Sequence, residues 1–150
     1  MKGAFKAEDF GKVLGDMVAR IEGARRADLY RDLLPTVYEE LHESFQKPLG
    51  KGGGPAPPHA PSTVAKYGQH QLLVLSGALM RSATRSTGEG SDYSYSENGL
   101  SVGVDIPYAK YHQYGTKHIP QRKFFYLSDD GRGRIAEKVK ELCFELLVGN

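Results

Sequence analysis

Residues 106–128 read IPYAKYHQYGTKHIPQRKFFYLS, an aromatic turn followed by a glycine, a proline and a second aromatic run. Gly115 permits a sharp turn because glycine accepts backbone angles that other residues avoid, and Pro120 holds the next segment extended. That segment delivers Phe124 and Leu127 to the core directly before a C-terminal helix. We therefore interpret the stretch as a turn that defines the fold.

Aromatic and cationic side chains alternate through this stretch. The rings belong to Tyr108, Tyr111, His112, Tyr114, Phe124, Phe125 and Tyr126, and the cations to Lys110, Lys117, Arg122 and Lys123. Such a mixture can stack bases and neutralise phosphates, or it can be a core whose cations stay in water. We favour the core, with Arg122 bonding backbone carbonyls or a neighbour's carboxylate. An oligomer interface fits the pattern equally well.

Length and composition indicate one domain over 1–150. The formal charge of +2 is far from the strong basicity of a dedicated nucleic-acid binder. Cys143, the single cysteine, stands in an apolar helical pattern and is interpreted as a buried residue, so we expect no disulfide. No window approaches the roughly 18 apolar residues of a membrane span. We expect no signal peptide and no membrane contact.

The first half of the chain is predicted to be helical up to a long loop. Apolar residues at spacings of three and four predict helices over 8–21 and about 26–45, with Pro35 kinking or restarting the second. Glycine and proline then predict an exposed loop over 48–63. Ser76 is a candidate N-cap for a short helix that follows it.

The segment after this short helix is predicted to form a sheet. Alternating Ser, Thr, Tyr and Val predict antiparallel strands in 82–87, 92–97 and 100–106. The Asn98-Gly99 pair favours the positive φ angles of a tight hairpin turn. A hairpin loop is placed at about 86–99.

A last apolar stripe predicts a C-terminal helix that begins near Arg132, with Ser128 and Asp129 available to cap it. Together the elements predict an α+β domain. It consists of two N-terminal helices, an antiparallel sheet of about three to four strands, and a C-terminal helix packed on the sheet.

Catalytic chemistry is not favoured by any pattern in the chain, so we expect no enzyme, no metal and no cofactor. The five histidines show no ligand spacing beyond His112 and His118. Cys143 stands where a thiolate is disfavoured. The acid pairs Glu39-Glu40 and Asp129-Asp130 are expected to face solvent or to cap helices.

Three blocks follow one another along the chain. They are Phe45, Pro48 and Leu49; then Leu75-Ser76-Gly77-x-Leu79-x-Arg81-Ser82; and then Tyr108-Ala109-x-x-His112-Gln113-x-Gly115 with Ile119-Pro120-x-Arg122-x-Phe124-x-x-Leu127-Ser128. Their order and spacing resemble those of the phage virion morphogenesis family, the Mu-like tail-completion proteins. The chain departs from the family's pattern at Gln121, where alanine is common, and in lacking a tryptophan near the Pro-Leu block.

The resemblance implies a structural subunit of a bacteriophage or phage-derived particle, which completes the tail or forms part of the head–tail neck. Its implied partners are further copies in a ring, commonly a hexamer, and other neck or tail proteins, with non-specific passage of DNA. The implied location is the virion, after assembly in the host cytoplasm. The alternative is a nucleic-acid-binding module that uses 108–123.

The candidate site has two parts. The fold-defining motif comprises Tyr108, His112, Gln113, Gly115, Pro120, Arg122, Phe124 and Leu127. The candidate interface combines loop, hairpin and cationic residues: Lys51, Pro55, Pro57, Pro58, His59, Glu89, Tyr93, Tyr95, Lys110, Lys117 and Lys123.

Overall fold

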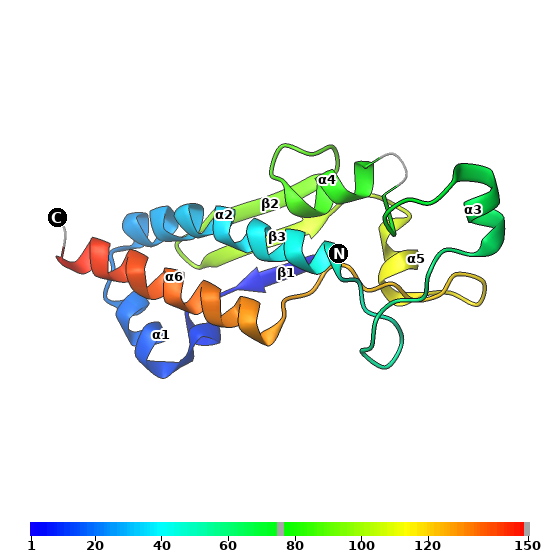
Figure 1. Cartoon of the computed structure of the whole chain (residues 1–150). Coiled ribbons are helices and arrows are strands. Elements are labelled where there is room, and N and C mark those ends of the chain that lie inside the picture. Colours follow the sequence, from blue (N-terminus) through cyan, green and yellow to red (C-terminus); the bar gives the residue numbers. More distant parts are fainter. Residues whose placement is uncertain (75–76, 149–150) are drawn as a thin grey trace.

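The computed structural model describes residues 1–74 and 77–148, which form a small antiparallel sheet packed against helices (Figure 1). Along the chain the elements are β1 (Lys2–Phe5), the 3-10 turn η1 (Ala7–Phe10), α1 (Gly11–Ala19), α2 (Gly23–Gln46), α3 (Pro61–Tyr67), α4 (Ala78–Thr84), β2 (Ser91–Ser96), β3 (Gly99–Val104), α5 (Ala109–Tyr114) and α6 (Asp129–Val148). The predicted α+β class is confirmed. In Figure 1 the molecule is elongated, with α1 and the end of α6 at one end and α3 and α5 at the other.

The sheet has the strand order β1-β3-β2 and is antiparallel throughout. The β2–β3 hairpin confirms two of the predicted strands and pairs Tyr93 with Val102. Its turn differs from the prediction, because Asn98 keeps a negative φ. The third strand is β1, which pairs Gly3 with Val102 and was not predicted. Four residues hold too few alternations to identify a strand without its partner.

The strand predicted over 82–87 is wrong. Ser82, Ala83 and Thr84 end α4 instead, and the Thr84 hydroxyl donates a hydrogen bond to the Met80 carbonyl at 2.7 Å. All three are buried, whereas a strand with one exposed face would bury only alternate residues. The hairpin loop predicted at 86–99 contains β2, so it is a loop only on either side of that strand.

Proline residues act differently in two helices. α2 continues through Pro35, so the predicted restart is wrong. Pro35 and Arg31 are both exposed, so water can bond the Arg31 carbonyl that the proline leaves without a partner. The loop predicted over 48–63 ends at Ala60, because Pro61 begins α3, where a missing amide hydrogen costs no helix bond.

α6 begins at Asp129, three residues before the predicted start at Arg132. The Gly131 amide donates to the Ser128 hydroxyl at 3.0 Å, which confirms Ser128 as a cap and satisfies a free amide of the first turn. The predicted N-cap Ser76 lies outside the described residues. No helix in the described part of the chain is long and apolar enough to cross a membrane.

α2 is the centre of the core. Its buried stripe of Leu29, Leu33, Val37 and Leu41 confirms the predicted spacing and faces residues of β3 and α6. Cys143 is buried in the same cluster, and burial raises the pKa of its thiol. A second cluster joins the end of α2 to α4 and the 123–127 segment, where Phe45 and Phe124 meet edge to face with ring centroids 5.6 Å apart. The predicted core role of Phe124 is confirmed.

Candidate assembly surface

Gln113 joins α5 to the extended segment that follows it. Its side-chain oxygen accepts the amide hydrogens of Phe124 at 3.1 Å and Phe125 at 3.0 Å, and its Nε2 donates to the Phe125 carbonyl at 2.8 Å. Gln113 is only 5% exposed, so water cannot readily replace these bonds. The motif is therefore a rigid platform held by one side chain.

The turn after α5 depends on Gly115. Its φ is +76°, and a Cβ atom there would lie 2.9 Å from the Gln121 backbone nitrogen. The chain then doubles back, and the Arg122 amide donates to the His112 carbonyl at 2.8 Å. The predicted role of Gly115 as the turning point is confirmed.

Arg122 fastens the glycine- and proline-rich loop to this platform. Its Nε donates to the Pro57 carbonyl at 3.0 Å and its Nη2 to the Pro58 carbonyl at 2.7 Å. Leu49 and Lys123 exchange two backbone hydrogen bonds, at 2.9 and 2.7 Å. Arg122 bonds carbonyls as predicted, but those carbonyls belong to the loop rather than to its own turn.

Three histidines and Arg122 line a cavity of about 360 Å³ between α3, α5 and the loop. The rings of His59 and His70 lie 4.1 Å apart. His112 Nδ1 is buried and has no hydrogen-bond partner among the described residues. Burial, and to a lesser extent the positive charge of Arg122, lower the pKa of His112, so its ring is neutral at neutral pH. Within 1–74 and 77–148, no group of three or more His, Cys, Asp or Glu could hold a metal ion.

The tyrosines of the motif face solvent. Tyr108, Tyr111 and Tyr114 are 44%, 43% and 68% exposed, whereas Ala109 and Gln113 are buried. Because Ala109 and Gln113 are four residues apart, they form the inner face of α5, and the tyrosines point elsewhere. The prediction that the aromatic side chains form core holds for Phe124 but is wrong for these three. Exposed tyrosine on a rigid element is typical of a protein interface.

The predicted interface residues divide between two places. Lys51, Pro55 and Pro57 line a shallow hollow with Tyr114, so the structure joins the loop to α5. Lys110, Lys117 and Lys123 are exposed on α5 and the segment after it, and Pro58 is exposed on the loop, with His59 beside it. Glu89, Tyr93 and Tyr95 are exposed on or beside the edge strand β2 instead.

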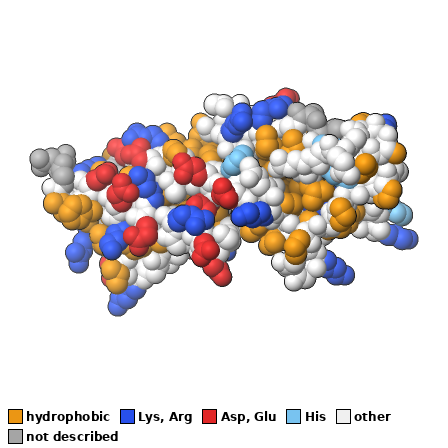
Figure 2. Space-filling model, viewed as in Figure 1, with side chains coloured by type: hydrophobic (Ala, Val, Ile, Leu, Met, Phe, Trp, Pro, Cys, Tyr) orange, Lys and Arg blue, Asp and Glu red, His pale blue; other side chains and the backbone are white. Residues whose placement is uncertain are grey.

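Positive and negative side chains are unevenly distributed along the sequence, although the formal net charge is only +2. Residues 44–88 and 106–128, called the basic end below, contain nine Lys and Arg and no Asp or Glu, which leaves eleven Lys and Arg against eighteen Asp and Glu elsewhere. The two parts carry formal charges of +9 and −7, which give the net +2. Figure 2 shows acidic side chains interspersed with Lys and Arg over α2 and α6, and no acidic side chain over the end that holds α3 and α5.

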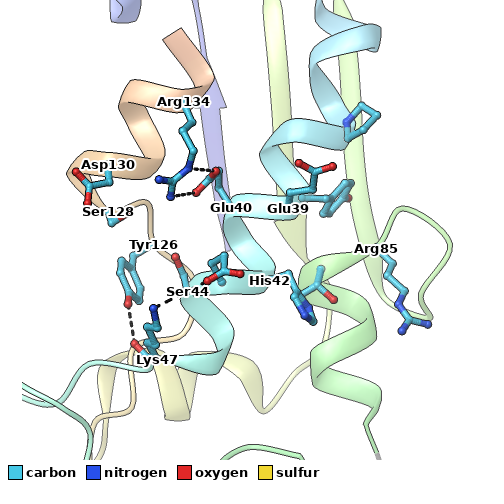
Figure 3. Close-up of a pocket in the computed structure, with 14 residues that line it drawn as sticks. Glu39, Glu40, His42, Ser44, Lys47, Arg85, Tyr126, Ser128, Asp130 and Arg134 are labelled. Carbon is cyan, nitrogen blue, oxygen red and sulfur yellow. Dashed lines mark hydrogen bonds and ion pairs between the residues drawn. The ribbon is translucent and has the colours of Figure 1, made fainter. Parts of the chain in front are cut away.

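A polar cavity of about 1010 Å³ lies between α2, α4 and the start of α6 (Figure 3). In it Arg134 donates two hydrogen bonds to the Glu40 carboxylate, from Nε to Oε1 at 2.6 Å and from Nη2 to Oε2 at 2.8 Å. The side chain of Glu40 is 8% exposed, so the prediction that Glu39 and Glu40 both face solvent is wrong for Glu40. The hydrogen bond from Arg134 lowers the pKa of Glu40. No local pattern could reveal a pair that is 94 residues apart in sequence.

No family model matches the chain, and no solved structure matches it. The chain is 30% identical over 132 residues to a protein of Haemophilus influenzae named Mu-like prophage FluMu G protein 2. The alignment covers 83% of each of the two chains, so the similarity extends through most of the fold.

Proposed function

Because this chain belongs to the family of Mu-like prophage FluMu G protein 2, we propose that it is a structural subunit of a bacteriophage or phage-derived particle. It completes the tail or forms part of the head–tail neck, and it acts through contacts with copies of itself and with other neck or tail proteins. In this proposal the copies form a ring, with six as the expected number. The proposed role is structural and calls for neither a catalytic residue nor a cofactor.

The observation that carries the proposal is the exposed tyrosine surface of α5. Tyr108, Tyr111 and Tyr114 stand on a helix that Gln113 and Arg122 hold rigidly to the segments around it. Tyrosine supplies apolar area and a hydroxyl at a small cost in side-chain entropy, which favours protein contacts. An assembly subunit needs such a surface, whereas an isolated protein gains nothing from it.

The test is particle assembly in a phage or prophage from which the gene for this chain is deleted. Supplying the wild-type chain restores complete, infectious particles, and the double substitution Tyr111→Ala and Tyr114→Ala restores few. Arg31→Ala is the control, because Arg31 is exposed on α2 and pairs with Asp28 and Asp32 of the same helix. Complete, infectious particles without the chain would refute the proposal.

A nucleic-acid-binding module is the second candidate, and the basic end favours it. Nine cations without an acid, beside three exposed tyrosines, match the composition of surfaces that bind single strands. Such binding weakens steeply as salt rises, in proportion to the number of phosphates neutralised. Titration of a labelled oligonucleotide at low salt tests this candidate, and absence of binding removes it.

A further inference from the structure

We propose that copies of this chain contact one another head to side, with the basic end of one copy seated on the acidic face formed by α2 and α6 of the next. The inference rests on the proposed function, because it names the surfaces through which the subunit meets its own copies. The occupant of the acidic face is a second copy of this chain.

Five lysines of the basic end carry charges without an ionic partner among the described residues. Lys51, Lys66, Lys110, Lys117 and Lys123 are exposed, and in the described part of the structure none of them forms an ion pair. The Lys66 and Lys110 ammonium groups instead lie 5.0 and 5.3 Å from the ring centres of the tyrosines next to them. The contact surface thus combines aromatic rings with unpaired cations, and its partner should offer carboxylates beside apolar groups.

The acidic face offers this combination. A groove of about 1010 Å³ runs along α6 and is lined by Met17 and Phe144, by five carboxylates, and by the three cations Arg134, Lys138 and Lys140. Phe144 is 62% exposed, so its ring offers apolar area for a contact within this groove. Of the carboxylates that line this groove, four form no ion pair within the described structure: Asp129, Asp130, Glu137 and Glu145. Glu39 of α2 is also without an ion pair among the described residues, and it lines the cavity of Figure 3, where Lys47 and Arg85 of the basic end lie as well.

Charge decides the polarity of the contact. Two basic ends placed together would oppose +9 with +9. Two acidic faces would repel more weakly, because α2 and α6 together carry ten Asp and Glu against seven Lys and Arg. A basic end on an acidic face pairs opposite charges, and it leaves one unused surface of each kind on the resulting dimer. Such a heterologous contact repeats until it closes into a ring or continues as a filament. The small net charge of +2 adds little repulsion between whole copies.

The experiment uses two triple variants of the full chain. Variant one carries Lys110→Glu, Lys117→Glu and Lys123→Glu at the basic end, and variant two carries Glu39→Lys, Glu137→Lys and Glu145→Lys on the acidic face. All six side chains are exposed, so the fold should persist. The matched control for variant one is Lys6→Glu with Lys12→Glu, two exposed lysines that lie outside both surfaces.

Self-association is measured by analytical ultracentrifugation at low salt. We expect the wild type and the control to associate, each triple variant to weaken association about tenfold or more, and an equal mixture of the two variants to recover it. Carbodiimide coupling of mixed isotope-labelled and unlabelled wild type should then join basic-end lysines to α2 or α6 carboxylates of another copy.

Three results would overturn the inference. The first is association of both variants at wild-type strength, and the second is a wild type that stays monomeric with no coupling between copies. The third is a variant one that still associates with other copies as the wild type does but has lost binding to duplex DNA. If particles require the chain while the variants still assemble them, this inference fails and the proposed function stands. If particles are complete without the chain, the proposed function fails instead.

Discussion

Replacing Gln113 with leucine should destabilise the fold by removing the hydrogen bonds that join α5 to the segment after it. The substitution keeps the side-chain volume but removes three hydrogen bonds and leaves the buried Phe124 amide and the half-buried Phe125 amide without an acceptor. A buried donor that loses its partner costs about 1–3 kcal/mol. Since the Phe125 groups are partly reachable by water, we expect the free energy of unfolding to fall by about 2–4 kcal/mol in total. A domain of this size is stable by only about 5–15 kcal/mol.

Urea unfolding followed by circular dichroism measures this loss as a lower midpoint with an unchanged slope. Gln121→Ala is the control, because it removes one half-buried bond to the Gln113 carbonyl at 3.1 Å and should cost about 1 kcal/mol. Gln113→Glu adds a pH test, since only the protonated carboxyl can donate to the Phe125 carbonyl. That variant should gain stability as the pH falls. A loss below about 1 kcal/mol for Gln113→Leu would refute the argument that this side chain holds the motif together.

Other substitutions examine the remaining contacts. A lysine in place of Arg122 cannot bond the two loop carbonyls in one plane, so amide hydrogen exchange in the loop should become faster while the α2 amides stay protected. Unchanged exchange rates in the loop would contradict this role of Arg122. Gly115→Ala places a Cβ atom 2.9 Å from a backbone nitrogen at positive φ, so the free energy of unfolding should fall by about 2 kcal/mol or more. Gly52 also has a positive φ but lies in open space, so Gly52→Ala should lower it by about 1 kcal/mol. Equal losses would contradict the close approach at Gly115. The pKa of Glu40 is lowered, so its pair with Arg134 stabilises the fold above the ordinary pKa of 4.5 and loses that effect as the pH falls through the lowered pKa. The difference in free energy of unfolding between the wild type and Glu40→Gln should therefore shrink in acid. A difference that does not depend on pH would contradict the pairing.

Sequence patterns predicted the elements whose evidence is local. The stripe of α2 and the hairpin of β2 and β3 repeat a period over enough residues to be recognised. The role of Gly115 was equally local, because positive φ is a property of one residue. β1 and the end of α4 were missed or assigned wrongly, since each is short and takes its conformation from the surfaces that it packs against.

The candidate site was predicted only in part, for the same reason. The aromatic and cationic residues of 106–128 were identified, but whether a ring is buried depends on which side of α5 meets the rest of the molecule. Lys51 lines a hollow with Tyr114 only because the loop folds back onto α5, so its place on this surface could not be read from 106–128 alone.

The sequence by itself determined the α+β class, the apolar stripe of the central helix, and a motif built on Gln113, Gly115 and Arg122. These features follow from periodicity and from the backbone preferences of single residues, which act over a few positions. Only the tertiary structure decided that Arg122 holds the loop carbonyls, that Glu40 binds Arg134, and that the tyrosines of α5 face outward. Each of these depends on segments far apart in sequence, which meet because the two hydrophobic clusters draw them together.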